Sequence, residues 1–243
     1  MKQLRRLVLA FQFLTRLWMP AVDGYEPQEF SRVSYFFPLV GLVIGVILAG
    51  LVWISLPSGP WMAAVVALIG WTWVTGALHL DGLGDVADAL GAAHGNPDRF
   101  FEVLKDPHTG SFAVVAIVLQ LMAKLVFLAH LPASEWLWGL VLIPAWARWG
   151  TLVWNAMLPS LREGLAREFG QSRRSYSAGL WGLALSLMSF AFAPTLLAAL
   201  VVVPAIGLYW RRRLGGITGD CLGASVEVSE TILLGAIVLL GCV

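Results

Sequence analysis

VSYFFPLVGLVIGVILAGLVWI, residues 33–54, contains no charged side chain and is long enough to cross a lipid bilayer as one helix. A helix needs roughly 20 mostly apolar residues to span the hydrocarbon core. The whole chain has a similar character, because 58% of its 243 residues are hydrophobic, only 13% are charged, and the mean hydropathy is +0.78. Soluble domains have about 25% charged residues. The composition therefore predicts an integral membrane protein, with the lipid bilayer as one of its partners.

Further apolar stretches follow the first one and predict the fold class. We expect an all-α, polytopic transmembrane helical bundle of about seven spans, in a single integral membrane domain covering residues 1–243. Pro194 divides the longest stretch into two short spans, because proline interrupts a helix. The expected spans after the first are Trp61–Leu78, Ser111–Leu131, Trp136–Leu158, two within Ser177–Trp210 with a turn near Ala193–Thr195, and the short Thr231–Val243.

The N-terminal residues resemble a signal peptide at first sight, but polar residues interrupt the apolar run and no small-residue cleavage site follows. The apolar side chains have helical spacing, which predicts an amphipathic interfacial helix lying on the membrane surface. These side chains are Leu4, Leu7, Val8, Phe11, Leu14 and Trp18.

Lysine and arginine are concentrated on one side of the expected topology. With the N-terminus in the cytoplasm, four cytoplasmic segments hold 14 of the 16 Lys and Arg residues, and the other two, Lys124 and Arg148, lie inside spans. Positive charge favours the cytoplasmic side, so we expect the N-terminus and the active face there. The net charge of +1 predicts no nucleic-acid partner. The four segments are 1–32, 79–110, 159–176 and 211–230.

Three carboxylates in HLDGLGDVADALGAAHG, residues 79–95, form the first candidate site. Asp81, Asp85 and Asp88 are spaced i, i+4, i+7 and so share one face of a helix. Clustered carboxylates beside an apolar span are costly unless a cation binds them, and hard oxygen ligands suit Mg²⁺ or Mn²⁺. We interpret all three as metal ligands and His79 as a substrate-binding residue. The alternative is a solvated acidic helix start.

The stretch FEVLKDPHTGS, residues 101–111, precedes the next span and adds Lys105 and Asp106 to the expected membrane surface. A lysine beside a carboxylate suits a phosphate-binding catalytic site, so both are candidate catalytic residues together with Asp85 and Asp88. The alternative is an ordinary connection, because Pro107 and Gly110 are turn residues.

The stretch RRRLGGITGDCLGASVEVSE, residues 211–230, combines arginines, glycines and acids. Glycine-rich backbone with arginine nearby can bind phosphate, and we expect substrate to contact Arg213, Gly219, Asp220 and Glu227. A basic run after a span is also a common topology anchor.

Lys124 and Arg148 are expected to face the interior of the bundle, because intramembrane cations are costly. Lys124 either neutralises a substrate phosphate or pairs with a carboxylate, and Arg148 either has a functional role or extends to the membrane surface.

The chain resembles the cobalamin synthase (CobS) family, the adenosylcobinamide-GDP ribazoletransferases, in four segments that occur in the family's order. The segments are FLTRLWMP (13–20), TGALHLDGLGDVADALGA (75–92), LKDPHTGSF (104–112) and RRRLGGITGDCLGASVEVSE (211–230). The family usually has proline where this chain has Trp18 and more often threonine where it has Cys221, and these departures leave the acidic positions intact.

The resemblance implies a Mg²⁺-dependent, multi-pass enzyme of the bacterial inner membrane. Such an enzyme joins α-ribazole, or its 5′-phosphate, to adenosylcobinamide-GDP and releases adenosylcobalamin, or its 5′-phosphate, and GMP. A homo-oligomer or contact with other cobalamin-assembly enzymes is a further expectation. In the expected mechanism Asp88 accepts the proton of the attacking hydroxyl, while Lys105, Lys124 and Arg213 contact phosphate.

Two other functions remain open from the residues alone. A phospholipid-type alcohol phosphotransferase also has clustered aspartates beside spans, although this chain matches its D-x2-D-G-x2-A-R motif only in part. An ion or corrinoid transporter could use the aspartates and Lys124 as a coupling path, but the chain shows no inverted repeat with broken helices.

Overall fold

The computed structural model describes residues 2–22, 32–132, 135–161 and 175–241, and these residues form helices and turns without a β-strand. The predicted all-α class is therefore confirmed for this part of the chain. The α-helices are α1 (Lys2–Leu14), α3 (Phe37–Ser55), α4 (Pro60–Thr75), α5 (Leu78–Ala93), α6 (Pro97–Val103), α7 (Ser111–Ala129), α8 (Trp136–Met157), α10 (Ser175–Phe192), α11 (Ala199–Leu214) and α12 (Gly219–Leu240). Short 3₁₀ turns lie at Ser34–Phe36, Leu56–Ser58 and Pro194–Ala198.

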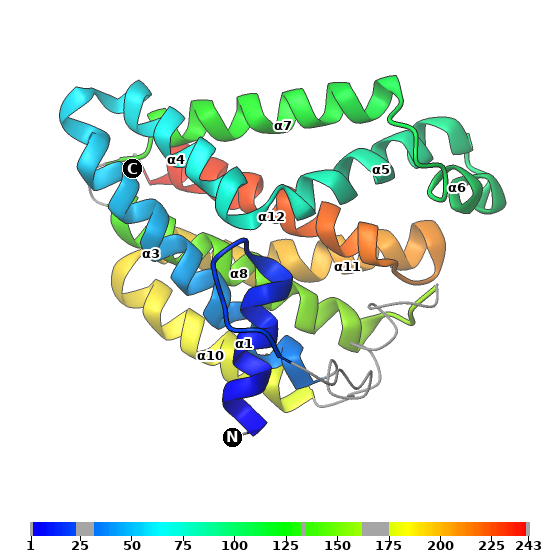
Figure 1. The fold of residues 1–243 in the computed structure, drawn as a ribbon, viewed down its shortest axis with the longest axis horizontal. Helices are drawn as coiled ribbons and strands as arrows, with labels where there is room; N and C mark the ends of the chain where they lie inside the picture. The colour runs from blue at the N-terminus through cyan, green and yellow to red at the C-terminus, as the bar shows by residue number, and fades with distance from the viewer. Residues whose placement is uncertain (1, 23–31, 133–134, 162–174, 242–243) are drawn as a thin grey trace.

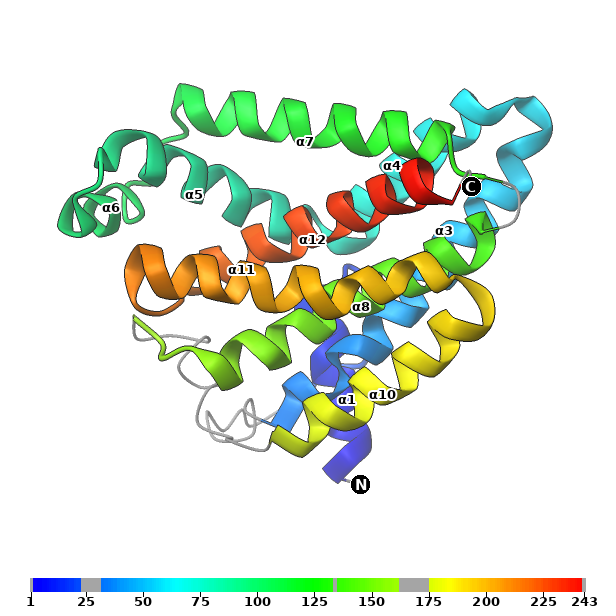
Figure 2. The ribbon, with the colours of Figure 1, turned by 180° about the vertical axis from the view of Figure 1, so that it is seen from behind.

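Helix α12 lies in the middle of the bundle, where it packs against α5, α7 and α8. Figure 1 shows α7 on one side of this central helix and α10 on the other, and Figure 2 shows the same order from behind. The turn between α3 and α4 lies at the same end of the bundle as the end of α12. Helix α6 and the turn between α11 and α12 lie at the opposite end (Figure 1). The connection after α6 and the glycine-rich turn before α12 therefore lie at the same end of the bundle.

Glycines allow α3 and α8 to pack very closely. A Cβ atom on Gly41 would lie 2.5 Å from the carbonyl oxygen of Pro144, and one on Gly45 would lie against the backbone of Leu140 and Val141. Small residues four apart bring two helix backbones together in membrane proteins, where dispersion forces rather than the hydrophobic effect drive association. This contact forms a large part of the buried core.

Helices α4 and α5 are separated by a bend of 86°. The bend is made by Gly76 and Ala77, whose φ angles are +63° and +59°, in the left-handed region. The backbone N–H of Arg16 donates to the carbonyl of Val74 at 2.7 Å, and the Arg16 side chain lies against Gly76. The segment after α1 therefore supports the bend and helps direct α5 toward α12.

Four helical segments are long and apolar enough to cross a membrane, or five if the bent pair α4 and α5 is one span. These helices have the character of a membrane protein, as expected. The predicted count of about seven is higher because it includes two more helices. Helix α10 is short, and α8 has 22 residues but carries Arg148 and several tryptophans, which lower its hydropathy.

One predicted boundary is wrong. The last helix begins at Gly219 rather than near Thr231, so the second half of the segment predicted at the cytoplasmic surface, 211–230, belongs to an apolar helix. The acidic side chains that suggested a surface position are paired inside the protein, as described below. Most of the predicted cytoplasmic segment 159–176 lies outside the described residues, as does the stretch 23–31.

The expected amphipathic helix is present as α1, and it packs against α3. Its residues Leu9, Phe11 and Leu14 are buried, whereas Leu4 is exposed. Part of the helix therefore packs against the bundle, and of the predicted apolar face only Phe11 and Leu14 are buried, while Leu4 and Trp18 are exposed.

Candidate active site

A cavity of about 200 Å³ lies where the start of α5 meets the start of α12. Its polar lining comes from His79 and Asp81 on α5 and from Gly219 and Asp220 on α12. Thr151 adds a hydroxyl from α8, and apolar residues from the end of α1 and the starts of α3, α5 and α12 complete the wall. They include Phe13, Leu14, Phe37, Leu78, Leu222 and Val226. The cavity thus combines carboxylates with an apolar wall, an arrangement common in small-molecule sites.

The three aspartates of the first motif lie on one continuous helix, α5, as their spacing predicted. Asp85 lies within electrostatic range of Asp81, Asp88 and also Asp220 from α12. Asp81 and Asp85 are exposed, and neither carboxylate has a hydrogen-bond or ion-pair partner among the described residues. Folding therefore brings a fourth carboxylate to the cluster and leaves two of its members available to a ligand.

Small residues permit this meeting of α5 and α12. A Cβ atom on Gly82 would lie 2.9 Å from the carbonyl oxygen of Asp220, and one on Gly223 would lie 3.5 Å from the Cα atom of His79. Thr218 precedes α12 and accepts a hydrogen bond from the N–H of Cys221 at 3.2 Å. The N-terminus of α12, with its partial positive charge, therefore opens at the cavity.

Asp88 has a different environment from the other two aspartates of α5. One of its carboxylate oxygens accepts a hydrogen bond from the N–H of Gly110 at 2.6 Å, and the other accepts one from the N–H of Ala113 at 3.0 Å. These amides belong to the first turn of α7 and the residue before it, where backbone N–H groups lack helical partners. Asp88 therefore caps α7 from a neighbouring helix, a role that the sequence analysis did not anticipate.

Lys105 and Asp106 lie on the exposed connection between α6 and α7. Asp106 accepts hydrogen bonds from the backbone N–H of His108 at 3.0 Å and pairs with its imidazole at 2.6 Å. The hydrogen bond from the His108 side chain lowers the pKa of Asp106. Neither Lys105 nor Asp106 is among the described residues that line the cavity, and their catalytic role remains a prediction.

The triple arginine forms the exposed last turn of α11, where positive charge interacts favourably with the helix dipole. Arg213 borders the turn between α5 and α6, next to Asn96 and Pro97, rather than the cavity. Gly215, with φ +76°, ends the helix in the left-handed conformation. Of the third motif's candidates, Gly219 and Asp220 therefore reach the cavity, whereas the structure puts Arg213 beside a different turn.

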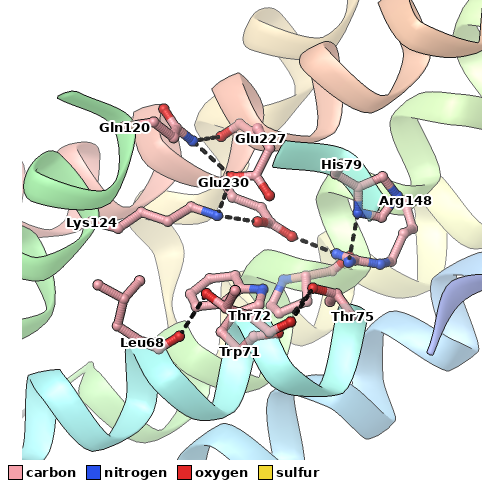
Figure 3. Close-up of polar contacts among 11 residues, drawn as sticks. Leu68, Trp71, Thr72, Thr75, His79, Gln120, Lys124, Arg148, Glu227 and Glu230 are labelled. Atoms are coloured by element: carbon pink, nitrogen blue, oxygen red, sulfur yellow. Dashed lines mark hydrogen bonds and ion pairs between the residues drawn. The ribbon is translucent and has the colours of Figure 1, made fainter. Parts of the chain in front are cut away.

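Glu227, the remaining candidate of that motif, belongs to a buried network of charged side chains shown in Figure 3. The Lys124 ammonium contacts Glu227 and Glu230 at 2.6 Å each, and Arg148 contacts Glu230 at 2.5 Å. Gln120 donates to Glu227 at 2.9 Å. The network contains two cations and two anions, so its charges balance.

Both intramembrane cations have partners inside the bundle, where they were expected to lie. Lys124 is paired with carboxylates and also lies over the ring of Trp71, 4.4 Å from its centroid. Arg148 is completely buried and does not extend to the surface. The Lys124 ammonium and the Glu227 carboxylate pair with each other inside the protein. Their contact with substrate remains a prediction.

The described residues contain no group of three or more His, Cys, Asp or Glu side chains arranged to hold a metal ion. Mg²⁺ commonly uses only one or two protein carboxylates and completes its coordination with water and substrate phosphates. Asp81 and Asp85, one helical turn apart with available oxygens, and Asp220 opposite them fit that requirement. The donor set is therefore suitable for Mg²⁺ without being a complete protein cage.

Two features of the site were missed in the sequence. Glu230 is the centre of the buried network, and its spacing of three residues from Glu227 in a mostly apolar stretch is a signal that both face the intramembrane cations. No local sequence pattern predicts the apolar wall that α1 and α3 give to the cavity, because this wall depends on how distant helices pack.

The chain is similar to known proteins along nearly its whole length. A protein-family model described as Cobalamin-5-phosphate synthase matches residues 6–238. A relative named adenosylcobinamide-GDP ribazoletransferase from Thiobacillus denitrificans is 45% identical over 232 residues, which cover 95% of this chain and 94% of the relative. Proteins of the same name from Laribacter hongkongensis and Novosphingobium aromaticivorans are 47% and 46% identical, over 95% and 98% of both chains. No solved structure matches the chain.

Proposed function

We propose that this chain, which belongs to the cobalamin-5-phosphate synthase family and is a transferase, joins α-ribazole or its 5′-phosphate to adenosylcobinamide-GDP and releases GMP. The corrinoid product is adenosylcobalamin or its 5′-phosphate. The observation that carries the proposal is the meeting of Asp81 and Asp220, from distant parts of the chain, in one cavity beside Asp85. Named relatives with the same reaction in their name support it.

The reaction breaks a phosphoanhydride bond and forms a phosphate ester bond. The 5′-hydroxyl oxygen of the ribazole forms a bond to the phosphorus that carries the cobinamide, and the bond from that phosphorus to the oxygen of the leaving GMP breaks. The hydroxyl proton passes to a carboxylate. We assign this proton to Asp85, because its carboxylate has no other partner among the described residues, whereas both oxygens of Asp88 are occupied by backbone amides.

Asp81 and Asp220, which line the cavity, are the residues that would hold Mg²⁺, or Mn²⁺, in this site, with water and substrate phosphate completing the coordination. The ion would neutralise the negative charge of the diphosphate. The protein itself supplies the N-terminus of α12 at Gly219, where backbone N–H groups favour an anion. Lys105 and Arg213, both exposed near the same end of the bundle, are candidates for the outer phosphate or the nucleotide.

The membrane location suits a large substrate with apolar and polar parts. We propose that the enzyme lies in the bacterial inner membrane, with the α6 end of the bundle facing the cytoplasm. Arg211 to Arg213 lie at this end, as the preference of cationic residues for the cytoplasmic side requires. The nucleotide-activated substrate would then enter from the side where GDP-linked compounds are made.

The test is GMP release by the purified protein in liposomes, with adenosylcobinamide-GDP and α-ribazole, first with Mg²⁺ and then with excess EDTA. We expect release only when both substrates and the ion are present. Asp85→Asn should lower the rate at least about a hundredfold, as loss of a catalytic proton acceptor does. Asp98→Asn, which changes an exposed carboxylate of α6, should have the wild-type rate.

Two results would reject parts of the proposal. Absence of GMP release from folded wild-type protein would reject the reaction itself. Undiminished release in EDTA would reject the role of the metal while leaving the transfer intact.

A further inference from the structure

The side chains of the buried network approach the cavity where Arg148 faces His79. The two carboxylate oxygens of Glu230 bind different cations, one Lys124 and the other Arg148. One terminal nitrogen of Arg148 donates to Glu230 and to the carbonyl oxygen of Pro144 at 3.1 Å. The other terminal nitrogen lies 3.4 Å from Nδ1 of His79, which lines the cavity (Figure 3). Glu230 therefore anchors the guanidinium, and the guanidinium faces the imidazole.

This contact selects one form of the imidazole. A guanidinium carries hydrogen-bond donors and no acceptor, so the nitrogen that faces it must be the acceptor. In a neutral imidazole only one nitrogen carries the hydrogen, and it is then Nε2. A distance of 3.4 Å is long for a hydrogen bond, so the contact orients the ring and chooses its tautomer more than it stabilises the fold.

His79 is well placed to use that hydrogen. Its side chain is buried, and it lines the cavity together with Asp81 and Asp220. Carboxylates only accept hydrogen bonds when ionised, so an oxygen of a bound phosphate or hydroxyl group needs a donor from elsewhere. A fixed N–H donor costs no reorganisation when charge develops on such an oxygen.

We propose that Arg148, held in place by Glu230, is a positioning residue that fixes His79 as the Nε2–H tautomer, so that His79 donates a hydrogen bond to a substrate oxygen in the cavity. The assignment of substrate rests on the proposed function. Because the charges of the network balance, Arg148 acts on His79 by orientation while its own charge is compensated by Glu230.

The tautomer can be measured directly by ¹⁵N NMR of the detergent-solubilised protein labelled at histidine. The chain has four histidines, and the signal lost in His79→Gln identifies the relevant pair of nitrogens. We expect the Nε2–H form in the wild type and a mixture, or the Nδ1–H form, in Arg148→Lys. A lysine keeps the charge near Glu230 but has one terminal nitrogen in place of the planar fork, whose second nitrogen faces His79 in the wild type.

Activity supplies the second readout. Arg148→Lys should lower kcat for GMP release at least about tenfold, as loss of an oriented donor does, with little change in KM. The matched control is Gln120→Met, which disturbs the opposite side of the same network at Glu227. This control should lower the melting temperature without changing the His79 signal or kcat.

Three outcomes overturn the inference: the Nδ1–H tautomer in the wild type, an unchanged His79 signal in Arg148→Lys, or equal losses of kcat in Arg148→Lys and Gln120→Met. The wild-type spectrum decides the matter even if Arg148→Lys does not fold. The NMR measurement needs no turnover, so a wild type that releases no GMP would reject the proposed function independently of the tautomer.

Discussion

Replacing Asp88 by asparagine separates the two roles that a carboxylate on α5 can have. From the sequence we expect Asp88 to bind metal or accept a proton, whereas its two oxygens accept hydrogen bonds from the N–H groups of Gly110 and Ala113. Asparagine has nearly the same shape but only one acceptor oxygen and no charge. The substitution therefore removes one of the two bonds and weakens the other.

The expected loss of stability follows from these two bonds. A hydrogen bond to a charged group contributes about 1.5–3 kcal/mol, and loss of a helix cap costs about 0.5–2 kcal/mol. Because Asp88 is half-buried, we expect Asp88→Asn to lower the free energy of unfolding by about 1.5–3 kcal/mol. For a chain of this length, 1 kcal/mol corresponds to about 2–4 °C, so the melting temperature should fall by about 3–12 °C.

The assay is thermal unfolding of the EDTA-treated protein in detergent, with GMP release measured below the transition. Asp85→Asn is the matched control, because it makes the same chemical change one helical turn away. Its carboxylate lies among Asp81, Asp88 and Asp220, so removal of its charge relieves repulsion. The melting temperature of Asp85→Asn should therefore equal or exceed that of the wild type, while GMP release is lost.

The reasoning fails if Asp88→Asn melts with the wild-type protein and yet releases no GMP. Asp88 would then act in the chemistry, as the sequence analysis expected, and its contacts with α7 would contribute little. Loss of stability in Asp85→Asn would contradict the described repulsion among the carboxylates.

Three other predictions concern packing, the buried network and the exposed connection. Gly45→Ala should lower the free energy of unfolding by about 1–3 kcal/mol, because a Cβ atom there meets the backbone of α8. Gly50→Ala, which has open space around it, should be neutral or slightly stabilising in the same thermal unfolding assay. Lys124→Met leaves two buried glutamates without their shared cation and should cost about 3–5 kcal/mol in denaturant unfolding; unchanged stability would show that the network is not desolvated. In an NMR titration the pKa of Asp106 should lie below the usual aspartate value and should rise in His108→Ala. The stabilisation from the Asp106–His108 pair should therefore be present above the usual pKa of an aspartate and be lost as the pH falls through the lowered pKa.

Local features of the sequence determined the class of protein and part of the site. Long runs of apolar residues indicate helices that cross a membrane, because the requirement for apolar surface applies to each segment separately. The shared face of Asp81, Asp85 and Asp88 followed from helical periodicity alone, and α5 contains all three. The resemblance to known sequences identified the family, which the comparisons confirm.

Contacts between distant segments were decided only by the tertiary structure. Glu227 and Glu230 looked like surface acids, but more than one hundred residues separate them from Lys124, their partner inside the bundle. Asp88 caps α7 through the N–H of Gly110, 22 residues later in the chain, so its local spacing could not separate it from Asp85. The physical reason is that each of these side chains takes its role from the desolvation and charge of its neighbours. Those neighbours are chosen by helix packing rather than by sequence spacing.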